Sequence, residues 1–170
     1  MPEGMLDFFE LVWAESQSLD SRESKKDILY TGTLYMYLDE RDNRTDQMQA
    51  LRIVSHGTLQ VSRHIILFES ESAPEGVKTP DGTIDGIRMD VKAVEGYGKW
   101  SIKDKFYDSI KKNVECVILY FHRKELYSVE RLDDGWVKFI NDKDSQRYRM
   151  TIKRVLCVVE QQVFEWRVPK

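Results

Sequence analysis

The sequence predicts an α/β fold, α+β in its connectivity, with a central mixed β-sheet of about four to six strands flanked by helices. Apolar residues recur at helical spacing in residues 45–59 and 101–112, and short runs of strand length lie between and after these segments. The Asp85-Gly86 pair joins two of the short runs, and Asp-Gly between alternating residues is a strong hairpin signal. From Thr45 onward the predicted order is therefore an αβββαβ core.

Length and composition predict a single domain over residues 1–170. A chain of 170 residues that is 41% hydrophobic and 11% aromatic can bury a core without disulfides or metal ions. We divide it into an N-terminal extension (1–44), a core (45–122) and a C-terminal part with a helix and strands (123–170). The extension is predicted to be helical and to cover a sheet edge or one face of the core.

Within the extension, residues 4–18 have the spacing of an amphipathic helix, and residues 19–28 are predicted to form a loop or a loose continuation of that helix. The aromatic-rich residues 28–38 fit a strand or a helix, and residues 39–44 are predicted to form a turn. Thr45 is the expected N-cap of the first core helix, which Gly57 weakens or ends. The apolar face of that helix is predicted to contain Met48, Leu51, Ile53, Val54 and Leu59.

The remaining predicted strands are residues 63–68, 83–84, 87–94, 116–121, 155–160 and 163–167, with a breaker-rich loop at 69–78 and a bend near Gln161-Gln162. The continuous apolar run at 116–121 is typical of a strand buried on both faces. The helix at 101–112 is expected to bury Ile102, Phe106, Ser109 and Ile110. A further helix within residues 126–140 is expected to be capped by Asp133 or Asp134.

Several large or reactive side chains are predicted to be structural. Trp136 and Trp166 lie in strongly apolar settings, and we expect both in the core. Cys116 and Cys157 lie in apolar runs without a second ligand at metal-binding spacing, which predicts buried free thiols. The three histidines, His56, His64 and His122, are expected to serve packing or to lie on the surface.

The charge is distributed unevenly along the chain. The net charge is −3, but the first 50 residues carry most of the acidic excess, and residues 86–112 and 143–154 are locally basic. Basic patches of this kind fit either nucleic-acid binding or ordinary solvated faces. The chain has no run of 18 apolar residues and no basic start typical of a signal peptide, so we expect no membrane association and a cytoplasmic location.

The residues with the clearest chemical pattern are Asp81, Asp90 and Lys92, which occur in Pro80-Asp81 and Asp90-Val91-Lys92. Side chains two apart in a strand face the same way, so Asp90 and Lys92 are expected on one face of the strand. Asp81 is expected to reach the same point across the hairpin. Two carboxylates can hold a hard divalent cation, whereas the alternative is that these residues belong to turns and a solvent face.

This spacing and element order resemble the PD-(D/E)xK nuclease family over residues 45–122. The resemblance implies phosphodiester hydrolysis with Mg²⁺ or Mn²⁺ held by Asp81 and Asp90. Lys92 would then orient the attacking water or stabilise the transition state. Glu69 and Glu95 are candidate additional acidic ligands.

A second resemblance is to the C-terminal tRNase domains of contact-dependent inhibition toxins, in the barnase, colicin and RelE group. It rests on Ile84-Asp85-Gly86 and Met89-Asp90, followed by a lysine-rich loop, a helix and an apolar strand. It implies metal-independent RNA cleavage, delivery into the cytoplasm of a target cell and a cognate immunity protein. Lys92, Lys99 and Ser101 would supply acid–base groups and Lys103 would bind phosphate, although no histidine is well placed for catalysis.

The segment Gly96–Trp100 supplies the candidate substrate-binding residues Lys99 and Trp100, which Ser101 and Lys103 follow in the helix. Lysine charge and an aromatic ring suit phosphate and base contacts, whereas the alternative is a connecting loop with Trp100 in the core. The sequence thus predicts a nuclease-like domain of bacterial toxin or restriction type that acts on DNA or RNA and is metal-dependent by preference. The alternatives are the metal-independent RNase and a non-enzymatic scaffold, immunity or mobile-element protein.

Overall fold

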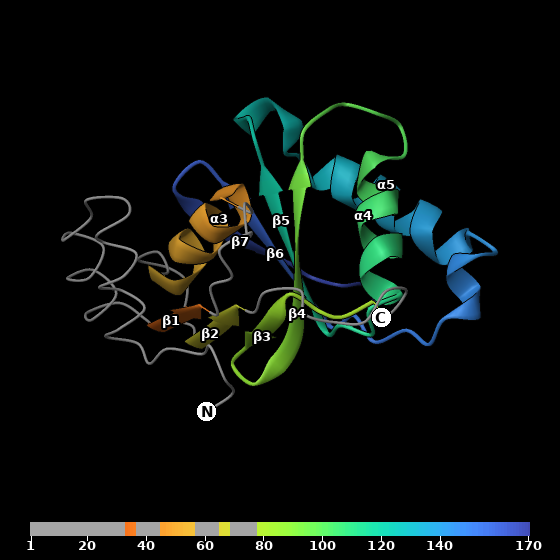
Figure 1. The fold of residues 1–170 in the computed structure, drawn as a ribbon. Helices are drawn as coiled ribbons and strands as arrows, with labels where there is room; N and C mark the ends of the chain where they lie inside the picture. The colour runs from red at the N-terminus through yellow and green to blue at the C-terminus, as the bar shows by residue number, and fades with distance from the viewer. Residues whose placement is uncertain (1–32, 37–44, 57–64, 69–77) are drawn as a thin grey trace.

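The computed structural model describes residues 33–36, 45–56, 65–68 and 78–170. These residues form a mixed sheet of seven strands, whose order in space follows their order in the chain (Figure 1). The strands are β1 (Thr33–Met36), β2 (Ile65–Phe68), β3 (Gly82–Ile84), β4 (Ile87–Val94), β5 (Cys116–Phe121), β6 (Arg154–Val159) and β7 (Gln162–Trp166). The predicted mixed sheet is confirmed, and its described part is one strand wider than the upper limit of the prediction.

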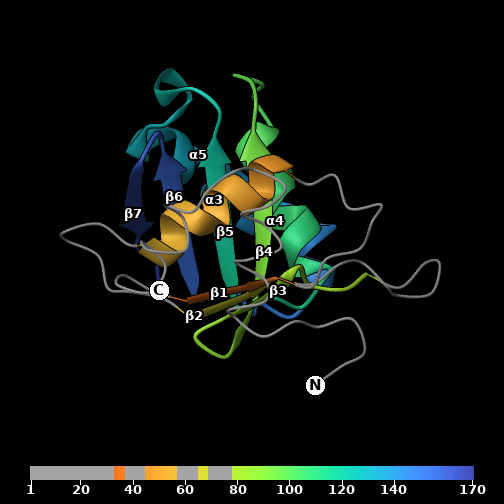
Figure 2. The ribbon, with the colours of Figure 1, turned by 60° about the vertical axis from the view of Figure 1, so that its left-hand side comes forward.

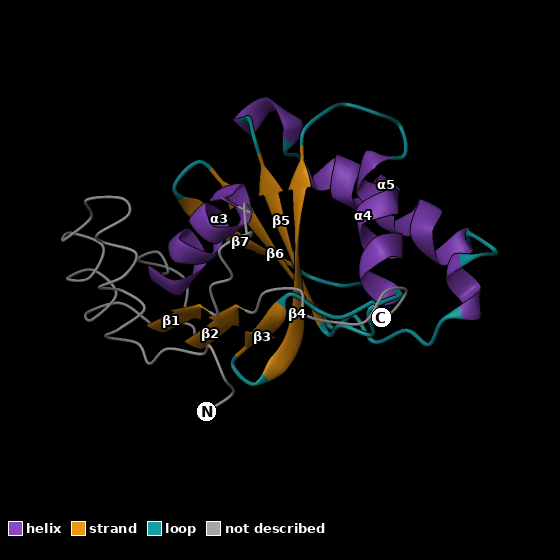
Figure 3. Ribbon diagram, in the orientation of Figure 1, coloured by secondary structure: helices purple, strands orange, loops and turns teal. Residues whose placement is uncertain are grey.

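Helices cover both faces of this sheet (Figures 2 and 3). The helix α3 (Thr45–His56) packs on one face, while α4 (Ser101–Ile110) and α5 (Val129–Asn141) pack on the other. Two short 3-10 helices, η1 (Lys124–Leu126) and η2 (Ser145–Arg147), flank α5. From α3 to β5 the order is helix, three strands, helix and strand, which confirms the predicted αβββαβ order.

The strand β5 shows why its sequence is apolar throughout. Cys116 and Ile118 belong to the core on the α3 side, whereas Val117, Leu119 and Phe121 belong to the core on the side of α4 and α5. Side chains alternate between the faces of a strand, so a strand with helices on both faces is apolar at every position. β5 pairs in parallel with both β4 and β6, as expected for strands joined through a helix.

The same alternation decides which side chains of β4 meet α4. Met89 and Val91 point into the core beneath α3, and Val94 points into the core beneath α4. Asp90 and Lys92 have the parity of Val94, so they face the α4 side, as the period of two predicted. β2, β3 and β4 are antiparallel neighbours, and β3 and β4 are joined by a two-residue turn.

That turn is the predicted Asp85-Gly86 hairpin. Ile84 pairs with Ile87, and both turn residues have positive φ, 49° for Asp85 and 82° for Gly86. Positive φ at both central positions defines a type I′ turn, which matches the twist of the flanking strands. The hairpin fixes the register that brings the start of β3 beside the first half of β4.

The predicted cap of α5 is wrong. The N-cap is Ser128, which precedes Asp133 and Asp134 in the chain by more than one helical turn. The Ser128 hydroxyl accepts a hydrogen bond from the Arg131 amide at 3.1 Å. Gly135 lies inside this helix. A Cβ at this position would stand only 2.5 Å from Cγ2 of Ile102, so the position requires a residue without a side chain. The glycine therefore allows the close approach of α4 and α5.

The predictions for the two tryptophans, the two cysteines and the buried face of α4 are confirmed. Trp136 and Trp166 are buried, and Cys116 and Cys157 are buried free thiols. The buried residues of α4 are the four that its spacing predicted, namely Ile102, Phe106, Ser109 and Ile110. In the described part of the chain, no helix is long and apolar enough to cross a membrane.

Part of the N-terminal predictions lies outside the described residues, including the helix at 4–18, the loops at 19–28 and 69–78, the turn at 39–44 and the roles of Gly57 and Leu59. Within residues 28–38 the structure describes β1, a strand, so the strand alternative holds for Thr33–Met36. β1 pairs in parallel with β2 over four residues. This part of the extension thus widens the sheet instead of forming a helix.

Candidate functional site

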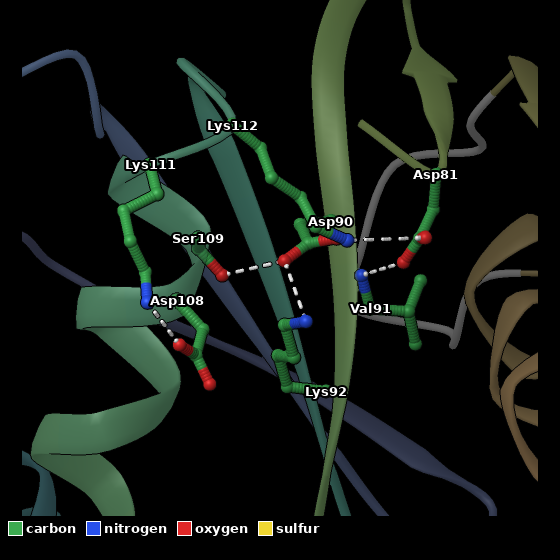
Figure 4. Close-up of polar contacts among 8 residues, drawn as sticks. All are labelled: Asp81, Asp90, Val91, Lys92, Asp108, Ser109, Lys111 and Lys112. Atoms are coloured by element: carbon green, nitrogen blue, oxygen red, sulfur yellow. Dashed lines mark hydrogen bonds and ion pairs between the residues drawn. The ribbon is translucent and has the colours of Figure 1, made fainter. Parts of the chain in front are cut away.

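The three residues predicted as a centre come together where β3 begins beside β4 (Figure 4). Asp81 immediately precedes β3, and its amide donates to the Met89 carbonyl at 3.1 Å, which extends the antiparallel ladder by one residue. This ladder places the Asp81 side chain next to the two strand residues that follow Met89. The predicted reach of Asp81 across the hairpin to Asp90 is confirmed.

The Asp81 carboxylate is held against β4. Its Oδ2 accepts a hydrogen bond from the Val91 amide at 2.8 Å, and its Oδ1 lies 3.6 Å from Nζ of Lys112. The side chain is only 4% exposed. Because the backbone amide fixes one oxygen, the other oxygen is directed toward Asp90 and Lys112 (Figure 4).

The Asp90 carboxylate is fully buried and has three side-chain partners. Oδ2 accepts a hydrogen bond from the Ser109 hydroxyl at 2.8 Å and lies 3.1 Å from Nζ of Lys92. Oδ1 accepts a hydrogen bond from Nζ of Lys112 at 2.8 Å. Buried charges are stable only when they are paired and hydrogen-bonded, and Asp90 meets both conditions.

The two carboxyl groups differ in their affinity for a proton. Burial raises the pKa of Asp81 to about 6, and the charge of Asp90 and the hydrogen bond between the two carboxyl groups act in the same direction. Burial also opposes ionisation of Asp90. The charge of Lys92, the hydrogen bond with Asp81 and the contact with Lys112 outweigh it, so the pKa of Asp90 is lowered. As the pH falls, Asp81 is therefore the first carboxyl group of the pair to take up a proton.

Further lysines lie beside this centre at the C-terminal end of α4. Lys111 forms an ion pair with Asp108 at 2.8 Å, and the hydrogen bond and positive charge of Lys111 lower the pKa of Lys78. Lys111 and Lys112 directly follow α4, while Lys78 precedes Asp81 by three residues. Lysines thus approach the centre from both segments that carry it, which favours an anionic ligand such as phosphate.

The carboxylates of Asp81 and Asp90 are suitable ligands for a hard cation, but the ammonium group of Lys112 supplies the positive charge beside them. One or two carboxylates, with water and substrate phosphate, are the usual ligands of Mg²⁺. Within the described residues no group of three or more acidic, histidine or cysteine side chains is arranged for a metal ion. Nζ of Lys112 lies between Asp81 and Asp90, so a metal ion shared by the two carboxylates would take the place of this ammonium group.

The candidate extra ligands do not extend this set. Glu95 is 72% exposed, and the contact recorded for it is with Nε2 of His122 at 4.0 Å. It lies five residues beyond Asp90 along β4, about 16 Å away at 3.3 Å per residue. His122 is partly exposed, as predicted for a surface or packing histidine. Glu69, His64 and the side chain of His56 lie outside the described residues.

Ser109 and Lys112 also contact the Asp90 carboxylate, although neither was a predicted site residue. Ser109 was predicted only as part of the buried face of α4, and Lys112 was counted only in the basic cluster. Their spacing in the sequence could have indicated this role. Ser109 and Lys112 are three residues apart at the end of the helix that follows the Asp90–Lys92 strand. Residues three apart in a helix are neighbours on one face, so both reach the same carboxylate.

The predicted substrate-binding residues lie at the other end of α4. Ser101 is the first residue of this helix and Ser109 its ninth, which separates them by about 12 Å along the axis. Lys99 and Trp100 precede Ser101, and Trp100 is 50% exposed, so the alternative that placed Trp100 in the core is wrong. Lys103 lies 3.4 Å from the Asp142 carboxylate and 3.7 Å from that of Asp104. The structure therefore does not bring these four residues to Asp90.

No known protein family, curated protein or solved structure matches the chain.

Proposed function

We propose that this chain is a nuclease domain that hydrolyses phosphodiester bonds in nucleic acid, with Asp81, Asp90 and Lys92 as its centre. The observation that carries the proposal is the convergence of these side chains from two strands of an αβββαβ core. The lysines beside this centre support it, because a phosphodiester is an anion that these ammonium groups attract.

The residues have distinct roles in this proposal. Asp81 and Asp90 would hold Mg²⁺ or Mn²⁺, which would supply positive charge for the phosphoryl oxygens and for activation of a water molecule. Lys92, anchored by Asp90 at 3.1 Å, orients the attacking water and stabilises the transition state. The water oxygen bonds to phosphorus and the bond to the leaving sugar oxygen breaks. The attacking water loses one proton to bulk water, and the leaving oxygen takes up one proton from bulk water. Lys112 releases the carboxylates and turns to the substrate phosphate.

A second candidate is a metal-independent RNase, and the position of Lys112 favours it. An ammonium group within 2.8 Å of Asp90 and 3.6 Å of Asp81 balances the carboxylates without any ion. The residue set that the toxin resemblance implied is not assembled, however, because Ser101 is about 12 Å from Ser109 and its hydroxyl accepts from Arg131. A metal-free reaction would therefore depend on Lys92 and Lys112 instead of Lys92, Lys99 and Ser101.

Cleavage assays distinguish the two candidates. Plasmid, single-stranded DNA and total tRNA are incubated with the protein in Mg²⁺, in Mn²⁺ and in a chelator. The metal-dependent proposal expects product only with an ion, whereas cleavage of tRNA alone, unaffected by the chelator, supports the second candidate. Absence of cleavage on every substrate contradicts both and leaves the scaffold or immunity reading.

The Lys92→Met variant tests the centre itself. Methionine keeps most of the apolar stem but removes the charge, so cleavage should fall about 100- to 1000-fold, as expected for loss of one transition-state contact. The matched control is Lys143→Met, because Lys143 is exposed and lies beyond α5, away from the centre. Equal activity of the two variants would remove Lys92 from the proposed centre.

A further inference from the structure

A cavity of about 280 Å³ lies between the loop that joins β4 to α4 and the helix α5. Its lining includes Tyr97, Lys99, Ile102, Arg131, Asp134 and Lys138. We define this cavity, with the adjacent Trp100 ring, as the loop pocket. It lies at the opposite end of α4 from Asp90, so it is a separate feature from the Asp81–Asp90–Lys92 centre.

The charges of the loop pocket favour an anion. Three cationic side chains line it, Lys99, Arg131 and Lys138, against the single carboxylate of Asp134, which is already paired with Lys138. Arg131 is held in place, because its guanidinium donates to the carbonyls of Leu126 and Gly96 and to the Ser101 hydroxyl. A fixed guanidinium in a concave site is well suited to contact a phosphate group.

Two exposed aromatic rings accompany these cations. Tyr97 is 58% exposed, and the guanidinium groups of Arg131 and Arg123 lie 5.5 and 5.7 Å from its ring centre. Trp100 is 50% exposed, with the ammonium groups of Lys99 and Lys138 at 5.0 and 5.2 Å. Each ring is therefore positioned by cations while part of it remains open to solvent. Aromatic rings beside cationic side chains are the features that bind single-stranded nucleic acid.

The volume of the loop pocket limits the size of the ligand that it can bind. A volume of about 280 Å³ is near the lower end for small-ligand sites, which suits one nucleotide unit better than a duplex. We propose that the loop pocket binds one nucleotide of a single-stranded nucleic acid. The phosphate contacts Lys99 and Arg131, and bases stack on Tyr97 or Trp100.

The location suggests how the pocket relates to the proposed chemistry. The axial distance of about 12 Å between Ser101 and Ser109 is short enough for one single strand to reach from the pocket to the centre. A strand held at the pocket would thus present a phosphodiester a few nucleotides away to Lys92 and Lys112. Only this assignment of the bound strand as substrate rests on the proposed nuclease function; binding at the pocket does not.

Fluorescence anisotropy with a labelled 12-nucleotide oligothymidine in a chelator tests the binding without cleavage. Trp100→Ala should weaken binding about 5- to 100-fold, as loss of one stacking contact does, and should leave the thermal midpoint unchanged because the ring is exposed. The matched control is Phe164→Ala, since Phe164 is also partly exposed but lies on the edge strand β7. Trp100→Ala and Tyr97→Ala variants that both bind like the wild type would overturn the proposal.

Salt dependence provides an independent measure of the phosphate contact. Lys99→Gln should lower the slope of log affinity against log salt by about 0.7, the contribution of one neutralised phosphate on a single strand, and Lys143→Gln should not. The pocket proposal expects an acidic polyglutamate peptide to compete poorly with the oligonucleotide. Equal competition, or preferred binding of a blunt duplex, would contradict recognition of a single strand.

The same variants separate this proposal from the nuclease proposal. If Trp100→Ala weakens binding while no substrate is ever cleaved, the pocket proposal holds and the nuclease function fails. If Lys92→Met abolishes cleavage while Trp100→Ala and Tyr97→Ala leave oligonucleotide binding unchanged, the nuclease function holds and the pocket proposal fails.

Discussion

At the scale of single residues, the two buried carboxyl groups of the candidate centre differ because their donors differ. Asp90 has a hydroxyl and two ammonium groups within 3.1 Å. Asp81 has one backbone amide at 2.8 Å and an ammonium group at 3.6 Å. Burial acts on both carboxyl groups, but only Asp90 has enough compensating partners to keep its pKa below the ordinary value. This asymmetry leads to a pH-dependent effect on stability that is specific to Asp81.

The Asp81→Asn variant should become more stable relative to the wild type as pH rises from 4 to 6. The folded-state pKa of Asp81 is raised to about 6 from 3.8, so its stabilising contribution is present below pH 4 and is lost as pH rises through 6. Asparagine does not titrate and still accepts from the Val91 amide. Across this window the difference in unfolding free energy should grow by on the order of 2–3 kcal/mol. Urea unfolding at several pH values in a chelator measures this difference. A difference in unfolding free energy that does not change with pH would contradict the raised pKa of Asp81.

Lys112 is the residue whose removal should reveal an ion site. With methionine in its place, Asp81 and Asp90 lose the ammonium group between them, and their mutual repulsion increases. We expect Lys112→Met to be less stable than the wild type in a chelator and to gain more in thermal midpoint from millimolar Mg²⁺ or Mn²⁺. Lys143→Met is the control and should respond to the ion as the wild type does. A Lys112→Met protein that gains nothing from either ion would contradict metal binding at these carboxylates.

At the scale of elements, the contact between α4 and α5 is set by a residue without a side chain. Phe106 of α4 packs against Trp136 and Phe139 of α5, with ring centres 5.1 and 5.7 Å apart. Gly135 precedes Trp136 and allows the backbone of α5 to approach Ile102. The close approach buries these rings, and it also forms one wall of the loop pocket.

Gly135→Ala should therefore destabilise the protein, although alanine is the better helix former. Intrinsic propensity favours alanine by roughly 1 kcal/mol, but the new Cβ would stand 2.5 and 2.6 Å from two carbon atoms of Ile102. Relieving such overpacking costs about 1–3 kcal/mol, so we expect a net loss measurable by urea unfolding. Val137→Ala, at an exposed position of the same helix, should change stability by less. A Gly135→Ala protein more stable than the wild type would show that the helices separate easily.

At the scale of the whole molecule, the sheet has a described edge formed by the N-terminal extension. β1 adds a parallel strand to β2, whereas the candidate centre lies between β3, β4 and the end of α4. The candidate centre and the strand that covers this edge of β2 thus belong to different parts of the sheet. This separation predicts what removal of the extension does.

A truncated chain that begins at Thr45 should lose stability and keep its specific activity per folded molecule. The deletion removes β1 and leaves the backbone groups of β2 without that partner. Thermal unfolding, together with cleavage rates normalised to the folded fraction, measures both effects. Loss of activity with an unchanged thermal midpoint would instead give the extension a role in the chemistry.

The sequence by itself determined the features that depend on neighbouring residues. Asp85-Gly86 predicted the hairpin because few residues other than glycine, asparagine and aspartate adopt positive φ readily. The apolar run at 116–121 predicted a strand between two helical layers, and the period of two placed Asp90 and Lys92 on one face. The proximity of Asp81 followed from the hairpin, since a short turn fixes the register of both strands. In each case the geometry of a single strand or turn was sufficient to predict the feature.

Only the tertiary structure decided which distant side chains complete these local patterns. Lys112 is 22 residues from Asp90, and its position beside both carboxylates depends on how α4 docks on the sheet. The same docking separates Lys99 and Ser101 from the centre and places them beside Arg131 of α5, 30 residues after Ser101. The role of Gly135 was also decided there, because a sequence pattern does not reveal which backbone will approach a glycine. Contacts of this kind arise from packing between elements, and the period of a single element carries no information about its neighbour's position.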